Sequence, residues 1–374
     1  MELYKRIFYR LDFVLLAVVF LIIILSLFVL NSATAHLAGS FVKAQIRNIL
    51  VGLFALIVVL RFDYTVLAKY TKYLYGLNLA ILIAVLVFGH EAKGSTRWLV
   101  IPVLGQFQTS EFAKLLIIIT LAQYLVKKQG ELETLTDLIP VFIFVGVPLS
   151  LILVQPDLGT SLGFVAIMLG MLFVAGANPK LLLGLFGGGF LAGMGYLLGH
   201  LKFGWWVPLK SYQLNRILVV FDPTLDLKGV GWNVWQSKIA IGSGGLFGKG
   251  LGSGTQSTGQ FLPEQWTDFI FAVLAEELGF LGGAILLVLY FVFLYRGIKI
   301  AIASQDLFGS LIATGIVSMF LFHIVENIGM TMGIMPVTGL PLPFVSYGGS
   351  NMLTNMIALG ILLNIYVRRK KIIF

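Results

Sequence analysis

Long, continuous apolar runs separated by short polar segments dominate the chain. The first run, Asp12 to Leu30, follows Lys5, Arg6 and Arg10 and is too long for the apolar part of a signal peptide. About 20 apolar residues suffice for a helix to cross a bilayer. Because the runs are continuous and do not alternate every second residue, they predict membrane helices and not barrel strands.

The number of predicted spans depends on whether one long apolar run forms one helix or two. As a single helix, Leu138 to Ala175 would be about 55 Å long, nearly twice the bilayer core. Gln155-Pro156-Asp157-Leu158-Gly159 interrupts this run, and proline and glycine break helices, so we expect two spans. The other eight predicted spans are Asp12 to Leu30, about Asn48 to Leu60, about Leu74 to Phe88, about Glu111 to Val126, Leu181 to Leu198, Phe269 to about Tyr295, about Phe308 to Thr331, and about Met352 to Val367.

The basic residues predict the orientation of these ten spans. Fifteen Lys and Arg residues lie in or beside the segments on the side of the termini, against four in the short loops of the other side. Cytoplasmic loops carry the excess of Lys and Arg, so both termini are expected in the cytoplasm. The long polar region between spans seven and eight, about residues 200 to 268, is then extracytoplasmic. We predict an all-α polytopic membrane protein with one integral membrane domain, residues 1–374.

The amino-acid composition excludes several classes of protein and of chemical site. The chain is 58% hydrophobic and 11% charged, whereas soluble domains are about a quarter charged. The net charge of +9 does not indicate nucleic-acid binding, because most basic residues border the spans. The absence of cysteine excludes disulfides, thiol nucleophiles and cysteine-held metal. The four histidines form no ligand pair, so no cofactor is evident, although a divalent cation could bridge a pyrophosphate.

An ionisable residue lies where the eighth span begins. In LPEQWTDFIFAVLAEELG, residues 262–279, polar side chains from Glu264 to Asp268 precede the apolar run. Charge is costly in a membrane, so Asp268 is a candidate functional residue. The alternative is a helix cap, because an aspartate before a helix satisfies free backbone N–H groups.

Two further polar sites lie in apolar surroundings. Glu111 and Lys114 are three residues apart and share a helix face, so they form either a structural ion pair or part of a cavity. Asp157 follows Pro156 and is either a turn-forming residue or a third cavity residue. Together with Asp268, and with Trp98 in the third loop, these residues map to the outer ends of spans. We therefore expect one outward-facing polar cavity.

A glycine-rich segment, residues 239–259, lies in the long polar region. Eight glycines fall between Gly242 and Gly259, and glycine-rich backbone can wrap an anion with its N–H groups. The spacing fits neither a P-loop nor G-x-G-x-x-G. A flexible linker is the alternative. Aromatic and aliphatic residues on both flanks, including Trp235 and Trp266, favour a segment packed on the membrane surface.

Six motifs spread over nearly the whole chain resemble the SEDS family (shape, elongation, division and sporulation). They are Gly94–Trp98, Ser110–Lys114, Gln155–Thr160, Gln236–Gly245, Pro263–Ala272 and Pro341–Ser350. Ala275-Glu276-Glu277-Leu278-Gly279 and Asn327-Ile328-Gly329-Met330 are more similar to the elongation branch than to the division branch. Trp266 departs from the family, which usually has histidine there, so a histidine is not essential to the chemistry of this chain.

The resemblance implies peptidoglycan glycosyltransfer from lipid II, with a class B penicillin-binding protein, a transpeptidase, as partner. It implies that Asp268 is catalytic, and a carboxylate can act as general base on a sugar hydroxyl. Cations and N–H donors would stabilise the departing undecaprenyl pyrophosphate. The remaining candidate residues for substrate binding and for the cavity are Trp98, Glu111, Lys114, Asp157, Arg216, Lys238, Lys249, Glu264, Ser346 and Ser350.

Two other functions compete with polymerisation. A lipid II transporter also needs many spans and polar groups, but it requires them along a path from both sides of the membrane. Here the membrane-adjacent acids gather at the outer ends, which disfavours transport. A scaffold that only organises the penicillin-binding protein would leave the polar cavity unexplained.

Overall fold

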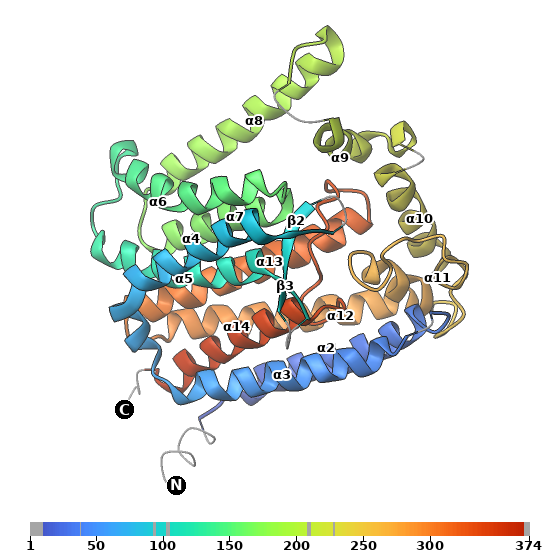
Figure 1. The fold of residues 1–374 in the computed structure, drawn as a ribbon, viewed down its shortest axis with the longest axis horizontal. Coiled ribbons are helices and arrows are strands. Elements are labelled where there is room, and N and C mark those ends of the chain that lie inside the picture. Colours follow the sequence, from blue (N-terminus) through green and yellow to red (C-terminus); the bar gives the residue numbers. More distant parts are fainter. Residues whose placement is uncertain are drawn as a thin grey trace.

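The main body of the protein is a bundle of long apolar helices (Figure 1). The computed structural model describes residues 10–37, 39–92, 95–101, 105–207, 211–226 and 229–369. Within these ranges nine helical segments are long and apolar enough to cross a membrane, and α7 is a shorter apolar helix. The bundle helices are α2 (Phe13–Ala33), α3 (Phe41–Arg61), α4 (Thr71–Phe88), α5 (Thr109–Lys127), α6 (Leu135–Val154), α7 (Leu158–Val174), α8 (Pro179–Phe203), α12 (Ile270–Ile302), α13 (Leu307–Thr331) and α14 (Gly349–Val367).

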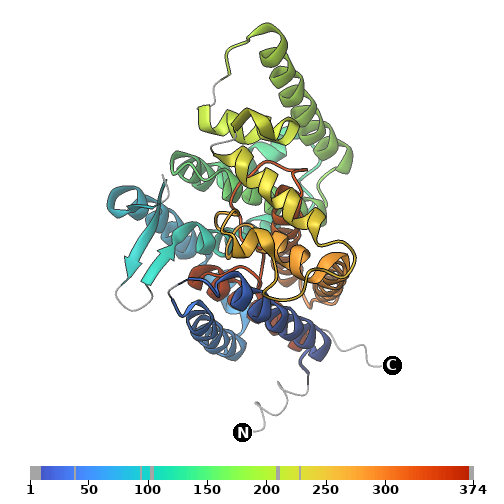
Figure 2. The same ribbon diagram turned by 90° about the vertical axis from the view of Figure 1, so that its right-hand side faces the viewer.

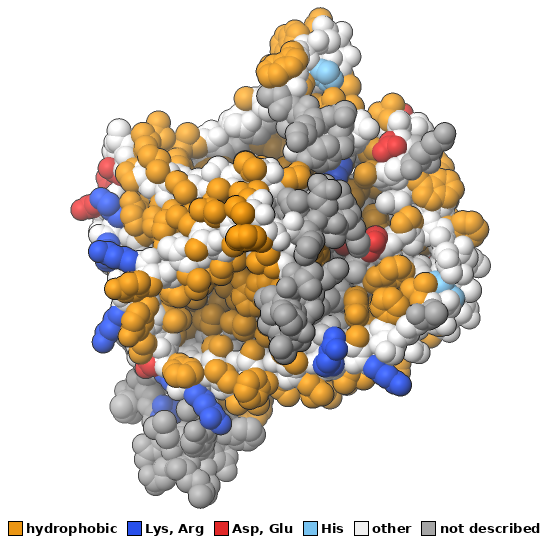
Figure 3. Space-filling model, in the orientation of Figure 1, with side chains coloured by type: hydrophobic (Ala, Val, Ile, Leu, Met, Phe, Trp, Pro, Cys, Tyr) orange, Lys and Arg blue, Asp and Glu red, His pale blue; other side chains and the backbone are white. Residues whose placement is uncertain are grey.

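The surface of the bundle is that of a membrane protein. Hydrophobic side chains cover most of the face seen in Figure 3, and Lys and Arg gather at its edges. The helices α5, α13 and α14 are mostly buried in the interior, whereas α8 is almost entirely exposed and projects from the bundle (Figure 1). The polytopic helical fold predicted from the sequence is confirmed.

The predicted break between spans five and six is confirmed. Helix α6 ends at Val154 and α7 begins at Leu158. Asp157 is the N-cap of α7, where its carboxylate accepts a hydrogen bond from the backbone N–H of Thr160 at 3.1 Å. Pro156 lies in the link between the two helices, and Asp157 caps the start of the second.

Both ends of the described chain lie at one end of the bundle. The guanidinium of Arg369, after α14, donates to the carbonyl of Arg10, before α2, at 3.5 Å. At the same end Arg296, in the C-terminal half of α12, forms an ion pair of 2.5 Å with Asp12. Helix α2 has 21 residues and therefore extends about 30 Å from this end.

A small antiparallel sheet replaces the predicted loop between spans three and four. Its strands are β1 (His90–Ala92), β2 (Ser95–Ile101) and β3 (Gly105–Gln108), in the order β1-β2-β3. The all-α prediction is therefore wrong in this segment. The run Trp98 to Ile101 is aromatic and aliphatic, a composition that suits a strand.

Short helices cross the opposite end of the bundle. The segment between α8 and α12 contains α9 (Ser211–Phe221), η2 (Pro223–Asp226), α10 (Val230–Ser243) and α11 (Thr255–Thr258). Figure 2 looks onto this end and shows α9 and α10 lying across the bundle. The long polar region is thus a folded layer.

The eighth predicted span is not one continuous helix. At Gly279 in α12 the backbone leaves the helical region, with φ 66° and ψ −163°. A Cβ at this residue would lie 2.3 Å from the backbone nitrogen of Gly248, so the glycine-rich segment passes directly against it. The prediction of an uninterrupted helix from Phe269 is wrong here, and residues 270–278 form a separate helical piece beneath the glycine-rich segment.

Candidate functional site

Asp268 lies in a tight turn immediately before α12. The carbonyl of Glu264 accepts backbone hydrogen bonds from Thr267, Asp268 and Phe269 at 3.1, 3.1 and 3.3 Å. Glu264 itself has φ +53°, and its carboxylate accepts from the hydroxyl of Thr267 at 2.9 Å. The N-cap of α12 is Phe269, so Asp268 lies one residue outside the capping position. This geometry favours a role for Asp268 other than the cap.

The loop that precedes α14 holds this turn in place. The buried Ser346 donates its hydroxyl to the carbonyl of Thr267 at 2.6 Å and accepts from the backbone N–H of Leu342 at 2.8 Å. The backbone N–H of Tyr347 donates to the carbonyl of Trp266 at 2.9 Å. Ser346 therefore fixes the Asp268 turn through these hydrogen bonds, and its side chain is buried.

A loop before α14 passes against the Asp268 carboxylate, and Arg216 binds that loop. Gly339 lies so close that a Cβ there would be 3.2 Å from Oδ2 of Asp268, and its φ is +77°. Arg216, on α9, donates to the carbonyl of the neighbouring Thr338 at 3.5 Å. The hydroxyl of Thr338 donates to Glu326, on α13. Arg216 is thus the predicted cation that reaches the loop beside Asp268.

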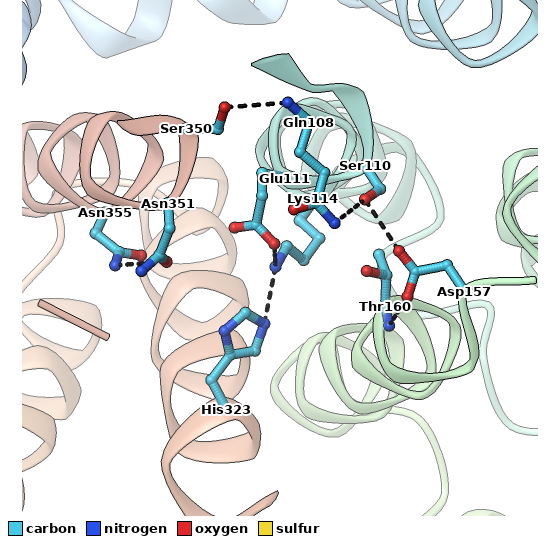
Figure 4. A network of polar contacts seen from close by, with 10 residues as sticks. All are labelled: Gln108, Ser110, Glu111, Lys114, Asp157, Thr160, His323, Ser350, Asn351 and Asn355. Carbon is cyan, nitrogen blue, oxygen red and sulfur yellow. Dashed lines mark hydrogen bonds and ion pairs between the residues drawn. The ribbon is translucent and has the colours of Figure 1, made fainter. Parts of the chain in front are cut away.

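A second polar cluster lies inside the bundle and is drawn in Figure 4. Lys114 forms an ion pair of 2.7 Å with Glu111, and both side chains are at most 1% exposed. The Lys114 ammonium also lies 2.9 Å from Nε2 of His323, on α13. An ammonium can only donate, so Nε2 accepts and the histidine proton is assigned to Nδ1. Of the two alternatives left open by the sequence, the buried ion pair is present, and His323 contacts its ammonium.

Asp157 belongs to a chain of hydrogen bonds beside this ion pair (Figure 4). Its carboxylate accepts from the Ser110 hydroxyl at 3.2 Å, and Ser110 accepts from the side chain of Gln108 at 3.2 Å. The backbone N–H of Gln108 donates to the Ser350 hydroxyl at 3.0 Å. Trp98 is half-buried on β2 and is paired with Gln108 on β3.

The two polar centres meet at one loop. Gly159, two residues after Asp157, packs so tightly that a Cβ there would lie 2.8 Å from the Leu340 side chain and 3.0 Å from that of Thr338. These two loop residues flank Gly339, which contacts Asp268. The start of α7 and the Asp268 turn therefore lie on two sides of the same loop.

The glycine-rich segment binds a carboxylate of the chain itself. Glu276, which is fully buried, accepts from Lys249 at 2.8 Å, from the Thr255 hydroxyl at 3.1 Å, and from the backbone N–H groups of Gln256 and Ser257 at 2.9 and 3.3 Å. Lys249 and this backbone, predicted to receive a pyrophosphate, are thus engaged by Glu276. The other predicted cation, Lys238, is exposed and packs beside Gly333.

Sequence reasoning missed His323, Glu326, Asn327 and Thr338 as parts of the site. Glu326 could have been predicted from the sequence, since an acidic residue inside a predicted span is a functional candidate by default. Asn327 donates to the backbone carbonyls of Asp268 and Leu340 at 2.9 and 2.8 Å, a contact between distant segments that no local pattern indicates.

Comparison with known proteins identifies the family. The profile of the FtsW, RodA and SpoVE proteins, described as "Cell cycle protein", matches residues 6–371. The peptidoglycan glycosyltransferase MrdB of Escherichia coli K12 is 37% identical over 363 residues, which cover 96% of this chain and 95% of MrdB. A chain from a peptidoglycan synthase complex that coordinates polymerization and crosslinking has a TM-score of 0.81 and 31% identity, with 96% and 98% of the two chains covered. The rod shape determining protein RodA of Thermus thermophilus has a TM-score of 0.70 and 29% identity, with 96% and 98% covered. The chain therefore belongs to the FtsW, RodA and SpoVE family, the SEDS family that its motifs resemble.

Proposed function

We propose that this chain is a peptidoglycan glycosyltransferase that joins lipid II disaccharide units into glycan strands during cell elongation. One observation carries the proposal: the fold holds Asp268 in a hydrogen-bonded turn against the Gly339 loop, and Arg216 donates to the Thr338 carbonyl of that loop. The similarity to MrdB, a peptidoglycan glycosyltransferase, and to RodA, a rod shape determining protein, supports it.

Asp268 acts as general base in the proposed reaction. A sugar hydroxyl is a poor nucleophile, and a positioned carboxylate removes its proton as the oxygen attacks. The new bond forms at the anomeric carbon of the donor while its bond to the pyrophosphate oxygen breaks. An α-linked donor that gives a β-linkage requires a single inverting displacement, so one base is enough. Arg216 is placed to stabilise the negative charge that develops on the departing pyrophosphate.

The site faces the extracytoplasmic side in this proposal, and both termini are cytoplasmic. The end of α2 contacts the site region, because Gln265 donates to the carbonyl of Ala33 at 2.8 Å. The start of α2 lies beside the chain ends, about 30 Å away along the helix, which is the thickness of a bilayer core. The excess of Lys and Arg near the chain ends supports this orientation.

Lipid tails and a partner complete the proposal. An apolar pocket between α6, α7 and α8 is lined by residues including Phe142, Met168 and Phe186 and is suited to an acyl or prenyl chain. A class B penicillin-binding protein is the proposed partner, supported by similarity to the chain from a synthase complex that coordinates polymerization and crosslinking. The transporter hypothesis is not favoured by these relatives.

Polymerisation in detergent tests the proposal. The purified chain and its penicillin-binding protein partner would be mixed with labelled lipid II, and products separated by length. Glycan polymer is the expected result, since synthesis needs no second compartment. A complex that moves lipid II between the leaflets of vesicles but makes no polymer in detergent would contradict the proposal and support transport.

A further inference from the structure

Glu326 is a buried carboxylate beside the site that the proposed reaction does not use. It lies near the end of α13 and is 2% exposed. Its Oε1 accepts a hydrogen bond from the hydroxyl of Thr338, and no donor among the described residues reaches its Oε2. A carboxylate kept inside a membrane protein is costly, so its contacts indicate what it contributes.

Thr338 connects Glu326 to the Asp268 carboxylate. Thr338 is itself buried, with its hydroxyl on Glu326 and its carbonyl accepting from Arg216 at 3.5 Å. The next residue, Gly339, has φ +77° and would place a Cβ 3.2 Å from Oδ2 of Asp268. The position of Thr338 therefore sets how closely the loop backbone approaches the carboxylate.

The adjacent residue of α13 fixes the same arrangement at the backbone. Asn327 donates to the carbonyl of Asp268 at 2.9 Å and to that of Leu340 at 2.8 Å. The end of α13 thus holds the Asp268 turn through one contact and the loop through two, at Thr338 and Leu340. These contacts determine the relative position of turn and loop on both sides of Gly339.

We propose that Glu326 is a positioning residue for Asp268, acting as the hydrogen-bond acceptor that holds Thr338 and so the Gly339 backbone against the Asp268 carboxylate. This inference rests on the proposed role of Asp268 as base. Catalytic groups must be held to within about 0.5 Å of the productive geometry. The contribution depends on an acceptor at Glu326, so a neutral amide can replace the carboxylate while an apolar side chain cannot.

Three substitutions test this inference in the purified complex with its partner. Thr338→Val removes the hydroxyl donor and Glu326→Leu removes the acceptor, whereas Glu326→Gln keeps an acceptor oxygen. The first two should lower kcat about 10- to 100-fold with little change in KM, since misplacement of about 1 Å costs that much in catalysis. Glu326→Gln should stay within about threefold of the unmodified protein. The double variant Glu326→Leu/Thr338→Val should be no worse than either single one, because both remove the same contact.

The matched control is Thr331→Val, which removes another fully buried hydroxyl at the end of α13. That hydroxyl donates only within its own helix, to the carbonyl of Ile328 at 2.8 Å, so kcat should be unchanged. Equal yield and melting temperature for all variants separate positioning from folding. If a variant is unstable, kcat is compared at equal amounts of folded protein. A higher kcat for Glu326→Gln than for Glu326→Leu then supports the positioning role.

Two results would overturn the inference. One is normal kcat for Thr338→Val. The other is a Glu326→Gln variant as slow as Glu326→Leu, which would mean that charge and not the hydrogen bond matters. In both cases the role of Asp268 would stand if Asp268→Asn still abolished polymer. Full polymerisation by Asp268→Asn would instead remove the proposed base and this inference together.

Discussion

The buried ion pair between Glu111 and Lys114 offers a test of how the interior of the bundle is stabilised. The two side chains are 2.7 Å apart and at most 1% exposed. Lys114→Met would leave the Glu111 carboxylate buried without its cation, and Glu111→Leu would leave the Lys114 ammonium with only His323. Loss of one partner from a buried pair costs about 3–5 kcal/mol, so each single variant should be destabilised by about that much.

The double variant Glu111→Leu/Lys114→Met should be more stable than either single one. Replacement of a whole buried ion pair by apolar residues of similar volume is often neutral or stabilising. The double variant still leaves Nε2 of His323 without its donor, which costs about 1–3 kcal/mol of stability. The two substitutions should therefore be strongly non-additive, as expected for residues in direct contact.

Unfolding of the purified variants in one detergent, by heat and by denaturant, measures these differences. The matched control is Lys128→Met, which breaks an ion pair with Glu131 of the same i, i+3 spacing, where the side chains are 39% and 61% exposed. Exposed pairs contribute little, so the control should unfold like the unmodified protein. Additive losses in the double variant, or single variants as stable as this control, would refute the assignment of a buried ion pair.

Two further predictions concern the orientation and the glycine-rich segment. A cysteine at the exposed Ser253 should react with a membrane-impermeant thiol reagent outside intact cells, whereas one at the exposed Gln129 should not, and the opposite pattern would reverse the proposed topology. Gly248→Ala should cost about 1–3 kcal/mol in melting experiments, because residue 248 has φ +78° and its Cβ would lie 2.1 Å from the carbonyl oxygen of Glu277. Gly188→Ala on α8, where a Cβ meets nothing within 4 Å, is the control, and equal stability of the two variants would contradict the packing described.

The apolar runs were sufficient to predict most of the fold. Run length identified the membrane helices, and the mismatch between Leu138–Ala175 and a bilayer located the break at Pro156. The break at Gly279 was missed because its cause is the backbone of Gly248, about thirty residues earlier in the chain. The sheet was missed because its strands have only three to seven residues and follow one another closely. Such a segment has the sequence pattern of a loop.

Buried polar positions were predictable where charged residues interrupt apolar sequence. Asp157 and the Glu111–Lys114 pair were found in this way, and the fold connects them to the loop beside Asp268. Lys249 was assigned to a phosphate because a sequence pattern does not reveal which anion a glycine-rich segment binds. Its partner, Glu276, comes from a helix 27 residues further along the chain.

Asp268 can be tested by a substitution that changes little besides its chemistry. Asp268→Asn keeps the size and the hydrogen-bonding capacity of the side chain but removes its ability to take a proton. Asp268 lies outside the capping position, so the change leaves the start of α12 intact. Asp222→Asn is the matched control, because Asp222 is exposed in the same polar region and its carboxylate accepts from the backbone N–H and the hydroxyl of Thr224 in a turn.

The most direct measurement is the amount of glycan polymer made from lipid II by Asp268→Asn, folded and bound to its penicillin-binding protein partner. The account predicts no polymer from this variant and normal polymer from Asp222→Asn under the same conditions. Near-normal polymer from Asp268→Asn would contradict the assignment of Asp268 as the base.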